Sequence, residues 1–240
     1  MDELLSGQLE KLKEFMEKEY RGEDIRFCSA YLFGDSKFIE KRRPLAEAFN
    51  SMASVERPNI IYIRTDTNLK INGVDIGELT EKLTLAAFFG GGVQSIEMEP
   101  CDVVISENLS FFMAEKPKDA VFLYNKGFHL TNQIATFVKK LSYRDVYFFG
   151  DFDCQGFFIL ESLRERIGKV EFYPDIETVG WVLERYKSQL PLAEIEECSE
   201  KRVVDSELLD FYRRYERKIE QEFLQVLFAK GGLKKPKWIM

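Results

Sequence analysis

The chain has 240 residues, of which 45% are hydrophobic and 31% charged, with a formal net charge of −7 at pH 7. This size allows a sizeable core, and the sequence excludes a bilayer-spanning helix because no apolar run approaches the roughly 20 residues that one needs. The opening Met1-Asp2-Glu3 lacks the basic start and apolar centre of a signal peptide, so we expect a cytoplasmic protein with no membrane partner.

Cysteine and histidine are sparse. The chain has a single histidine, His129, and four widely spaced cysteines: Cys28, Cys101, Cys154 and Cys198. No paired spacing or histidine cluster completes a zinc site, so we expect reduced, mostly buried thiols. A lone histidine is more often structural than a catalytic base.

The first hundred residues predict a mixed α and β region. Helical spacing of apolar residues marks 4–20, 38–52 and 77–89, a short apolar run at 25–33 suggests a strand, and 59–64 and a hairpin at 69–76 are further β candidates. Three consecutive glycines at 90–92 then break the pattern. We place a domain boundary near residue 100, giving domains at 1–100 and 101–240.

A basic cluster follows the first apolar run. Its members are Lys37, Lys41, Arg42 and Arg43. Lys37 and Lys41 are four residues apart and share a helical face, where they could contact phosphates. The alternative is a solvated surface. The acidic net charge argues against a protein whose whole surface grips nucleic acid, but it is compatible with such a local basic patch.

From residue 102 onward strands alternate with helices. The strands are expected at 103–105, 120–124, 146–149 and 170–173, and the last helices at 176–188 and 205–230, before a basic and mobile tail at 231–237. This alternation predicts an α/β fold with a parallel sheet of about four strands and helices on both faces.

Carboxylates follow these strands. Asp151 and Asp153 come after 146–149, and Glu107 comes after 103–105. Parallel strands deliver their carboxyl ends to one edge, where three carboxylates without histidine or cysteine would favour Mg²⁺ or Mn²⁺ and phosphoryl transfer. An ordinary Asp-Gly turn is the alternative for the aspartates. Asp175 follows the fourth strand and could approach the same edge or cap the next helix.

Four ordered motifs resemble a known family. The segments Ile105-Ser106-Glu107-Asn108 and Gly150-Asp151-Phe152-Asp153, the latter followed by Gly156, are similar to the glutamate and Asp-x-Asp pattern of the Toprim fold. Two more segments resemble the JetD family of Wadjet anti-plasmid systems, whose C-terminal domain is Toprim: Phe33-Gly34-Asp35-Ser36-Lys37 and Glu220-Gln221-Glu222.

The resemblance implies a function and a site. It implies a winged-helix-like α+β domain before the Toprim domain and metal-dependent cleavage of double-stranded DNA. Glu107 and Asp151 would be the principal metal ligands, Asp153 would complete the site, and Glu107 would also handle protons. Glu222 and Lys37 carry over as supporting or DNA-contact residues. The implied partners are the condensin-like JetABC subunits, and a homodimer is plausible because cutting both strands needs two sites.

One position departs from the pattern, and two other functions remain open. Many Toprim enzymes have a third aspartate where this chain has Gln155. A topoisomerase-like transesterase would need a tyrosine nucleophile, for which Tyr31 is the nearest candidate by position. A non-catalytic Toprim module for DNA binding or assembly is the other alternative.

Overall fold

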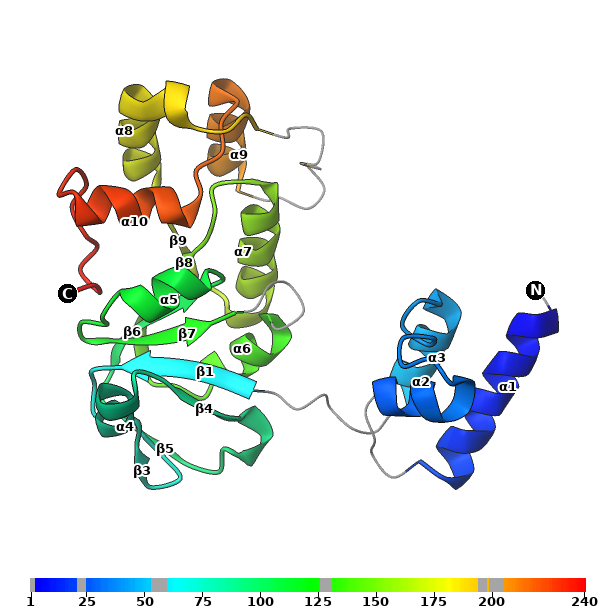
Figure 1. Cartoon of the computed structure of the whole chain (residues 1–240). Coiled ribbons are helices and arrows are strands. Elements are labelled where there is room, and N and C mark those ends of the chain that lie inside the picture. The colour runs from blue at the N-terminus through cyan, green and yellow to red at the C-terminus, as the bar shows by residue number, and fades with distance from the viewer. Residues whose placement is uncertain (1–2, 21–24, 53–59, 126–130, 194–197, 199–204) are drawn as a thin grey trace. The chain divides into compact units, whose positions relative to one another are not determined.

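The computed structural model consists of two compact units, residues 1–58 and 59–240 (Figure 1). It describes residues 3–20, 25–52, 60–125, 131–193, 198 and 205–240. The division lies well before the expected boundary near residue 100, because two segments from 60–89 pair into the main sheet of the second unit. His129 lies outside the described residues.

The first unit is built from three helices, α1 (Glu3–Lys18), α2 (Ile25–Phe33) and α3 (Arg43–Met52). The expected strand at 25–33 is wrong, because Ile25, Cys28 and Leu32 are buried at helical spacing along α2. Helix α3 also starts later than expected, after a turn at 36–41. Among the residues described in this unit no strand is found, so the β part of the expected α+β domain is not seen there.

The second unit contains a six-stranded sheet flanked by helices (Figure 1). Its order is β4 (Ala86–Phe89), β1 (Ile60–Thr65), β7 (Ala120–Tyr124), β6 (Cys101–Ser106), β8 (Tyr143–Phe149) and β9 (Glu171–Tyr173). The last four are parallel, which confirms the α/β class and the predicted parallel strands, while β1 and β4 add antiparallel pairs.

Three short strands from residues 70–75 and 96–97 form a second, smaller sheet. Strands β2 (Lys70–Ile71), β3 (Val74–Asp75) and β5 (Ile96–Glu97) make a three-stranded sheet. Asn72 and Gly73 have φ of 50° and 78°, the positive values that a tight hairpin requires, so the predicted hairpin is confirmed. The expected helix at 77–89 ends early, because α4 (Ile76–Leu83) stops before Thr84 at φ 72° and β4 follows.

Six further α-helices are found in the described part of the unit. None of the helices described in the chain is long and apolar enough to cross a membrane. The six helices are α5 (Leu109–Ala114), α6 (Thr131–Val138), α7 (Cys154–Ile167), α8 (Ile176–Tyr186), α9 (Ser206–Tyr215) and α10 (Gln221–Ala229). The single helix expected at 205–230 is therefore wrong. Glu216, with φ 52°, ends α9, and Ile219 then pairs with Phe152 before α10 begins.

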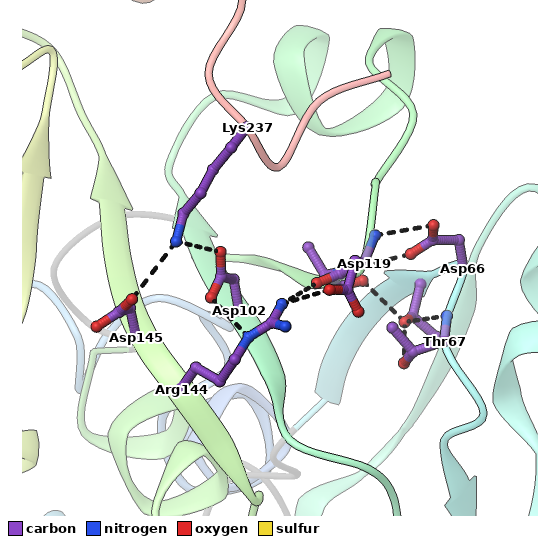
Figure 2. Close-up of polar contacts among 9 residues, drawn as sticks. Asp66, Thr67, Asp102, Asp119, Arg144, Asp145 and Lys237 are labelled. Carbon is purple, nitrogen blue, oxygen red and sulfur yellow. Dashed lines mark hydrogen bonds and ion pairs between the residues drawn. The ribbon is translucent and has the colours of Figure 1, made fainter.

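The C-terminal tail is docked rather than mobile. Trp238 is 1% exposed, and its backbone carbonyl accepts a hydrogen bond from the Lys118 backbone N–H at 3.0 Å. Figure 2 shows the Lys237 ammonium reaching Asp102 and Asp145, at 3.0 and 3.5 Å. The tail's basic composition therefore serves ion pairing within the unit.

The cysteines are not all reduced as expected. Cys154, at the start of α7, forms a disulfide with Cys198 across 44 residues of sequence, with Cα atoms 5.2 Å apart. Cys28 and Cys101 are buried thiols, as predicted. Sequence spacing gave no sign of the bridge, because the two partners meet only through the packing of distant segments.

The turn from β8 into α7 requires a glycine at position 156. The Asp153 side chain caps α7 by accepting a hydrogen bond from the Gly156 backbone N–H at 2.9 Å. A Cβ atom on Gly156 would lie only 2.1 Å from the backbone oxygen of Asp151. Any larger residue must therefore displace the turn that carries Asp151.

We expect Gly156→Ala to lower the melting temperature by several degrees, because the new methyl group collides with backbone. Gly180→Ala is the matched control within α8, where the new Cβ would meet only the Phe211 ring at 3.8 Å. Alanine is the better helix former, so this control should be neutral or slightly stabilising. Thermal unfolding of both variants tests the prediction, and equal melting temperatures would contradict it.

Candidate active site

Glu107 and Asp151 lie together at the carboxyl edge of the parallel strands. Strands β6 and β8 are neighbours in register, with Ser106 opposite Phe149, so the residues that follow them emerge side by side. The Asp151 backbone N–H donates to Glu107 Oε1 at 3.4 Å, a long hydrogen bond. The sheet therefore brings two of the three predicted carboxylates into one place.

Asp153 differs from this pair in its hydrogen bonds. Its Oδ1 caps α7, and its backbone N–H donates to the Asp151 carbonyl oxygen at 2.9 Å. Within the described part of the chain, no three histidine, cysteine, aspartate or glutamate side chains stand close enough to hold a metal ion. The closely joined group is thus the Glu107 and Asp151 pair, with Asp153 beside it.

Burial and mutual repulsion disturb the ionisation of this pair. Burial raises the pKa of Glu107 to about 7, and the negative charges of Asp151 and Asp153 add to the effect. Burial also raises the pKa of Asp151 to about 6, against the hydrogen bond from the Gln221 backbone, which lowers it. A divalent cation would relieve the repulsion, and the all-oxygen donor set fits Mg²⁺ or Mn²⁺.

The start of α10 forms the wall next to Asp151. The Gln221 backbone N–H donates to Asp151 Oδ1 at 2.8 Å, and its side-chain Oε1 accepts from the Ser106 hydroxyl at 2.9 Å. Glu222 accepts a hydrogen bond from the Asn108 side-chain amide. The predicted support residue Glu222 is therefore linked to the residue that follows Glu107.

Sequence reasoning missed three polar residues around the pair. Ser106, Asn108 and Gln221 were not assigned roles, although the first two flank Glu107 and the third is the centre of the Glu-Gln-Glu motif. Asn108 also caps α5, accepting from the Phe111 backbone N–H at 2.8 Å. Polar residues directly beside a candidate ligand were the available signal.

Asp175 caps a helix, which is one of the two roles predicted for it. Its side chain accepts a hydrogen bond from the Thr178 backbone N–H at 2.7 Å and caps α8. The carboxylate is exposed to solvent. This is the helix cap that was the alternative to a place in the site.

The basic cluster belongs to the first unit, in the turn before α3 and at the first residue of that helix. Three of its side chains have partners there: Lys41 pairs with Asp35 at 3.2 Å, Arg43 with Glu47 at 2.7 Å, and the Arg42 guanidinium lies 3.6 Å from the centre of the Phe38 ring. Lys37 is exposed.

The Phe-Gly-Asp-Ser-Lys motif builds this turn. Gly34 has φ 75°, and Asp35 accepts from the Lys37 backbone N–H at 2.8 Å. The Lys41 backbone N–H donates to the Lys37 carbonyl at 3.0 Å, so the two lysines are one turn apart although the segment is not a regular helix.

Tyr31 is 61% exposed on α2, and its hydroxyl donates to Glu19 at 3.1 Å. This hydrogen bond, with the negative charge of Glu19, raises the pKa of Tyr31. A raised pKa disfavours the phenolate that a nucleophilic tyrosine needs.

Comparison with known proteins gives a family for the chain. The family model described as Wadjet protein JetD, C-terminal, matches residues 56–231. None of the curated proteins matches the chain. The matched region spans most of the second unit, including both carboxylates of the pair and the start of α10, and the chain belongs to the family of the C-terminal region of the Wadjet protein JetD.

Proposed function

We propose that the protein is a metal-dependent endonuclease of the Toprim type that cleaves double-stranded DNA in a Wadjet defence system. The observation that carries this proposal is the contact between Glu107 and Asp151 at the carboxyl edge of the parallel sheet. Family membership supports the biological setting. Ligand sites in open α/β sheets occur at this same edge.

Glu107 and Asp151 would hold Mg²⁺ or Mn²⁺, with Asp153 alongside. A bound divalent cation supplies a positive charge for phosphate oxygens and lowers the pKa of a water molecule. Without a cation, the pKa of Glu107 is about 7. A bound cation would favour its carboxylate form, which could accept a proton from that water. Glu222 would support the site indirectly, through the hydrogen bond that it accepts from the Asn108 side chain.

Double-stranded DNA would be the substrate, with Lys37, Lys41, Arg42 and Arg43 as phosphate contacts of the first unit. Exposed Lys37 is the foremost of these, since the other three have partners. The condensin-like JetABC subunits would present the DNA. A homodimer would supply the second site needed to cut both strands.

A non-catalytic DNA-binding or assembly module is the second candidate. The observation that favours it is the engagement of Asp153 as a helix cap, which leaves two carboxylates in close association. A topoisomerase-like transesterase is less well supported, because Tyr31 has a raised pKa.

We expect Asp151→Asn and Glu107→Gln each to reduce Mn²⁺-dependent cleavage of supercoiled plasmid at least a hundredfold, because each removes a negatively charged ligand. Agarose gels of plasmid incubated with protein and JetABC measure the loss. Glu184→Gln is the matched control, since its carboxylate is exposed on α8 and pairs with Arg185 on the same helix.

Cleavage that survives both site substitutions would refute the site assignment. Wild-type binding to plasmid without cleavage, in the presence of Mn²⁺ and JetABC, would favour the non-catalytic module. A protein–DNA adduct that persists in denaturant would instead indicate a transesterase.

The raised pKa values also predict a pH-dependent stability. In the folded protein Glu107 titrates near 7 and Asp151 near 6, above their ordinary values of 4.5 and 3.8, so the folded state binds more protons in this range. Without divalent cations, the contribution of these two carboxyl groups to stability is therefore fully present below their ordinary pKa values and is lost as pH rises through about 7.

Glu107→Gln should remove the part of this pH-dependent loss of stability that comes from Glu107. In EDTA its melting temperature should exceed that of the wild type by a few degrees at pH 8, and the difference should vanish near pH 4.5, where Glu107 is protonated in the folded protein. Thermal unfolding across pH measures the effect, with Glu184→Gln as control. A difference that does not change with pH would contradict the prediction.

Lys37→Ala should weaken double-stranded DNA binding severalfold and reduce the slope of log affinity against log salt by about one, as expected for one lost phosphate contact. Lys13→Ala, an exposed lysine on α1 of the same unit, is the control. Fluorescence anisotropy at several salt concentrations measures both. Equal effects of the two substitutions would indicate nonspecific attraction only.

A further inference from the structure

Gln221 contacts both segments that carry the carboxylate pair. Its backbone N–H donates to Asp151 Oδ1 at 2.8 Å, and its Oε1 accepts from the Ser106 hydroxyl at 2.9 Å. The residue is fully buried. Among the described residues, no other one forms hydrogen bonds with both Asp151 and Ser106.

The Ser106 contact acts on Glu107. Ser106 Oγ also accepts from the Asn108 backbone N–H at 3.1 Å, so the turn that holds Glu107 is closed by the hydroxyl that Gln221 binds. Loss of the Gln221 side chain would leave this hydroxyl with its contacts to the Asn108 backbone, which include a long hydrogen bond of 3.4 Å to the carbonyl oxygen. The orientation of Glu107 would then be less well defined.

The start of α10 is pinned against the turn of Asp151. Phe152 and Ile219 form an antiparallel bridge, with backbone hydrogen bonds of 2.8 and 3.3 Å. Gln221 is the first residue of α10, a nine-residue helix, and the positive end of the helix dipole therefore faces the Asp151 carboxylate.

Packing alone does not account for a glutamine at this position. Its Nε2 is buried and has no hydrogen-bond partner among the described residues. Burying an unpaired donor is unfavourable, and an apolar side chain of similar size would avoid that cost. The partner of this side chain is at the other end of the amide, where Oε1 accepts from the Ser106 hydroxyl.

We propose that Gln221 is a positioning residue, which sets the orientation of Glu107 through its side chain and of Asp151 through its backbone N–H, and thereby the affinity of the pair for a divalent cation. This inference rests on the proposed function, because the cation is part of that proposal.

Two substitutions separate the two contacts. Gln221→Met keeps the N–H and the approximate volume but loses the bond to Ser106. Gln221→Pro also removes the N–H, and proline suits this position because it is the first helical residue and Glu220 before it has extended φ and ψ of −80° and 146°. Ser206→Pro is the matched control, at the exposed first position of α9.

The measurement is the rise of melting temperature with Mn²⁺ concentration, which needs neither DNA nor partners. We expect the half-saturating Mn²⁺ concentration to increase severalfold in Gln221→Met and tenfold or more in Gln221→Pro, as for outer residues that orient metal ligands. Ser206→Pro should not change it. A purely structural role would lower the melting temperature at all Mn²⁺ concentrations and leave the half-saturating value unchanged.

The outcomes are distinguishable. If the wild type is stabilised by Mn²⁺ and both variants keep its half-saturating value, the positioning role is refuted while the cation site stands. If Gln221→Pro fails to fold, Gln221→Met alone decides. If the wild type itself shows no Mn²⁺ stabilisation, the proposed cation site fails and the inference fails with it.

Discussion

In the second unit, one edge of the sheet keeps two mutually repelling carboxylates, Glu107 and Asp151, partly buried, and the candidate site depends on the elements that hold them there. Each is harder to ionise there than in water, and their contact is a single long hydrogen bond of 3.4 Å. Such a pair persists only where the surrounding structure fixes the backbone on both sides. The fixing elements are the register of β6 with β8 and the start of α10.

Aromatic rings pack together next to the strand end that carries Asp151. Phe149 ends β8 and Phe111 lies in α5, and their ring centroids are 4.3 Å apart and edge to face. Trp238 from the C-terminal tail packs against both, with centroids 6.1 Å away. The tail is held by Lys237 on the buried Asp102 (Figure 2). Segments more than a hundred residues apart therefore support one edge of the sheet.

The sequence predicted the parts of the fold whose cause is local, because alternating strand and helix patterns mark β6 to β9 and the placement of Glu107 and Asp151 follows from parallel strands. It failed where long-range packing decides. The short apolar run 25–33 is compatible with strand or helix, and only its buried face distinguishes them. The break between α9 and α10 arises from the pairing of Ile219 with Phe152, which no local pattern encodes. The Cys154 and Cys198 bridge has the same origin.

Asp153, the second aspartate of the Asp-x-Asp motif, caps a helix and still has an oxygen that could bind a cation. Asp153 uses Oδ1 to cap α7, and a carboxylate has a second oxygen that the cap does not occupy. The cap holds the Gly156 backbone, and Gly156 packs against the turn that carries Asp151, since a Cβ atom at position 156 would lie 2.1 Å from the Asp151 carbonyl oxygen. Asp153 therefore fixes Asp151 through the backbone, and it influences Glu107 and Asp151 electrostatically. A residue with this structural task can also contribute to a cation site, since capping and ligation use different oxygens of the same group.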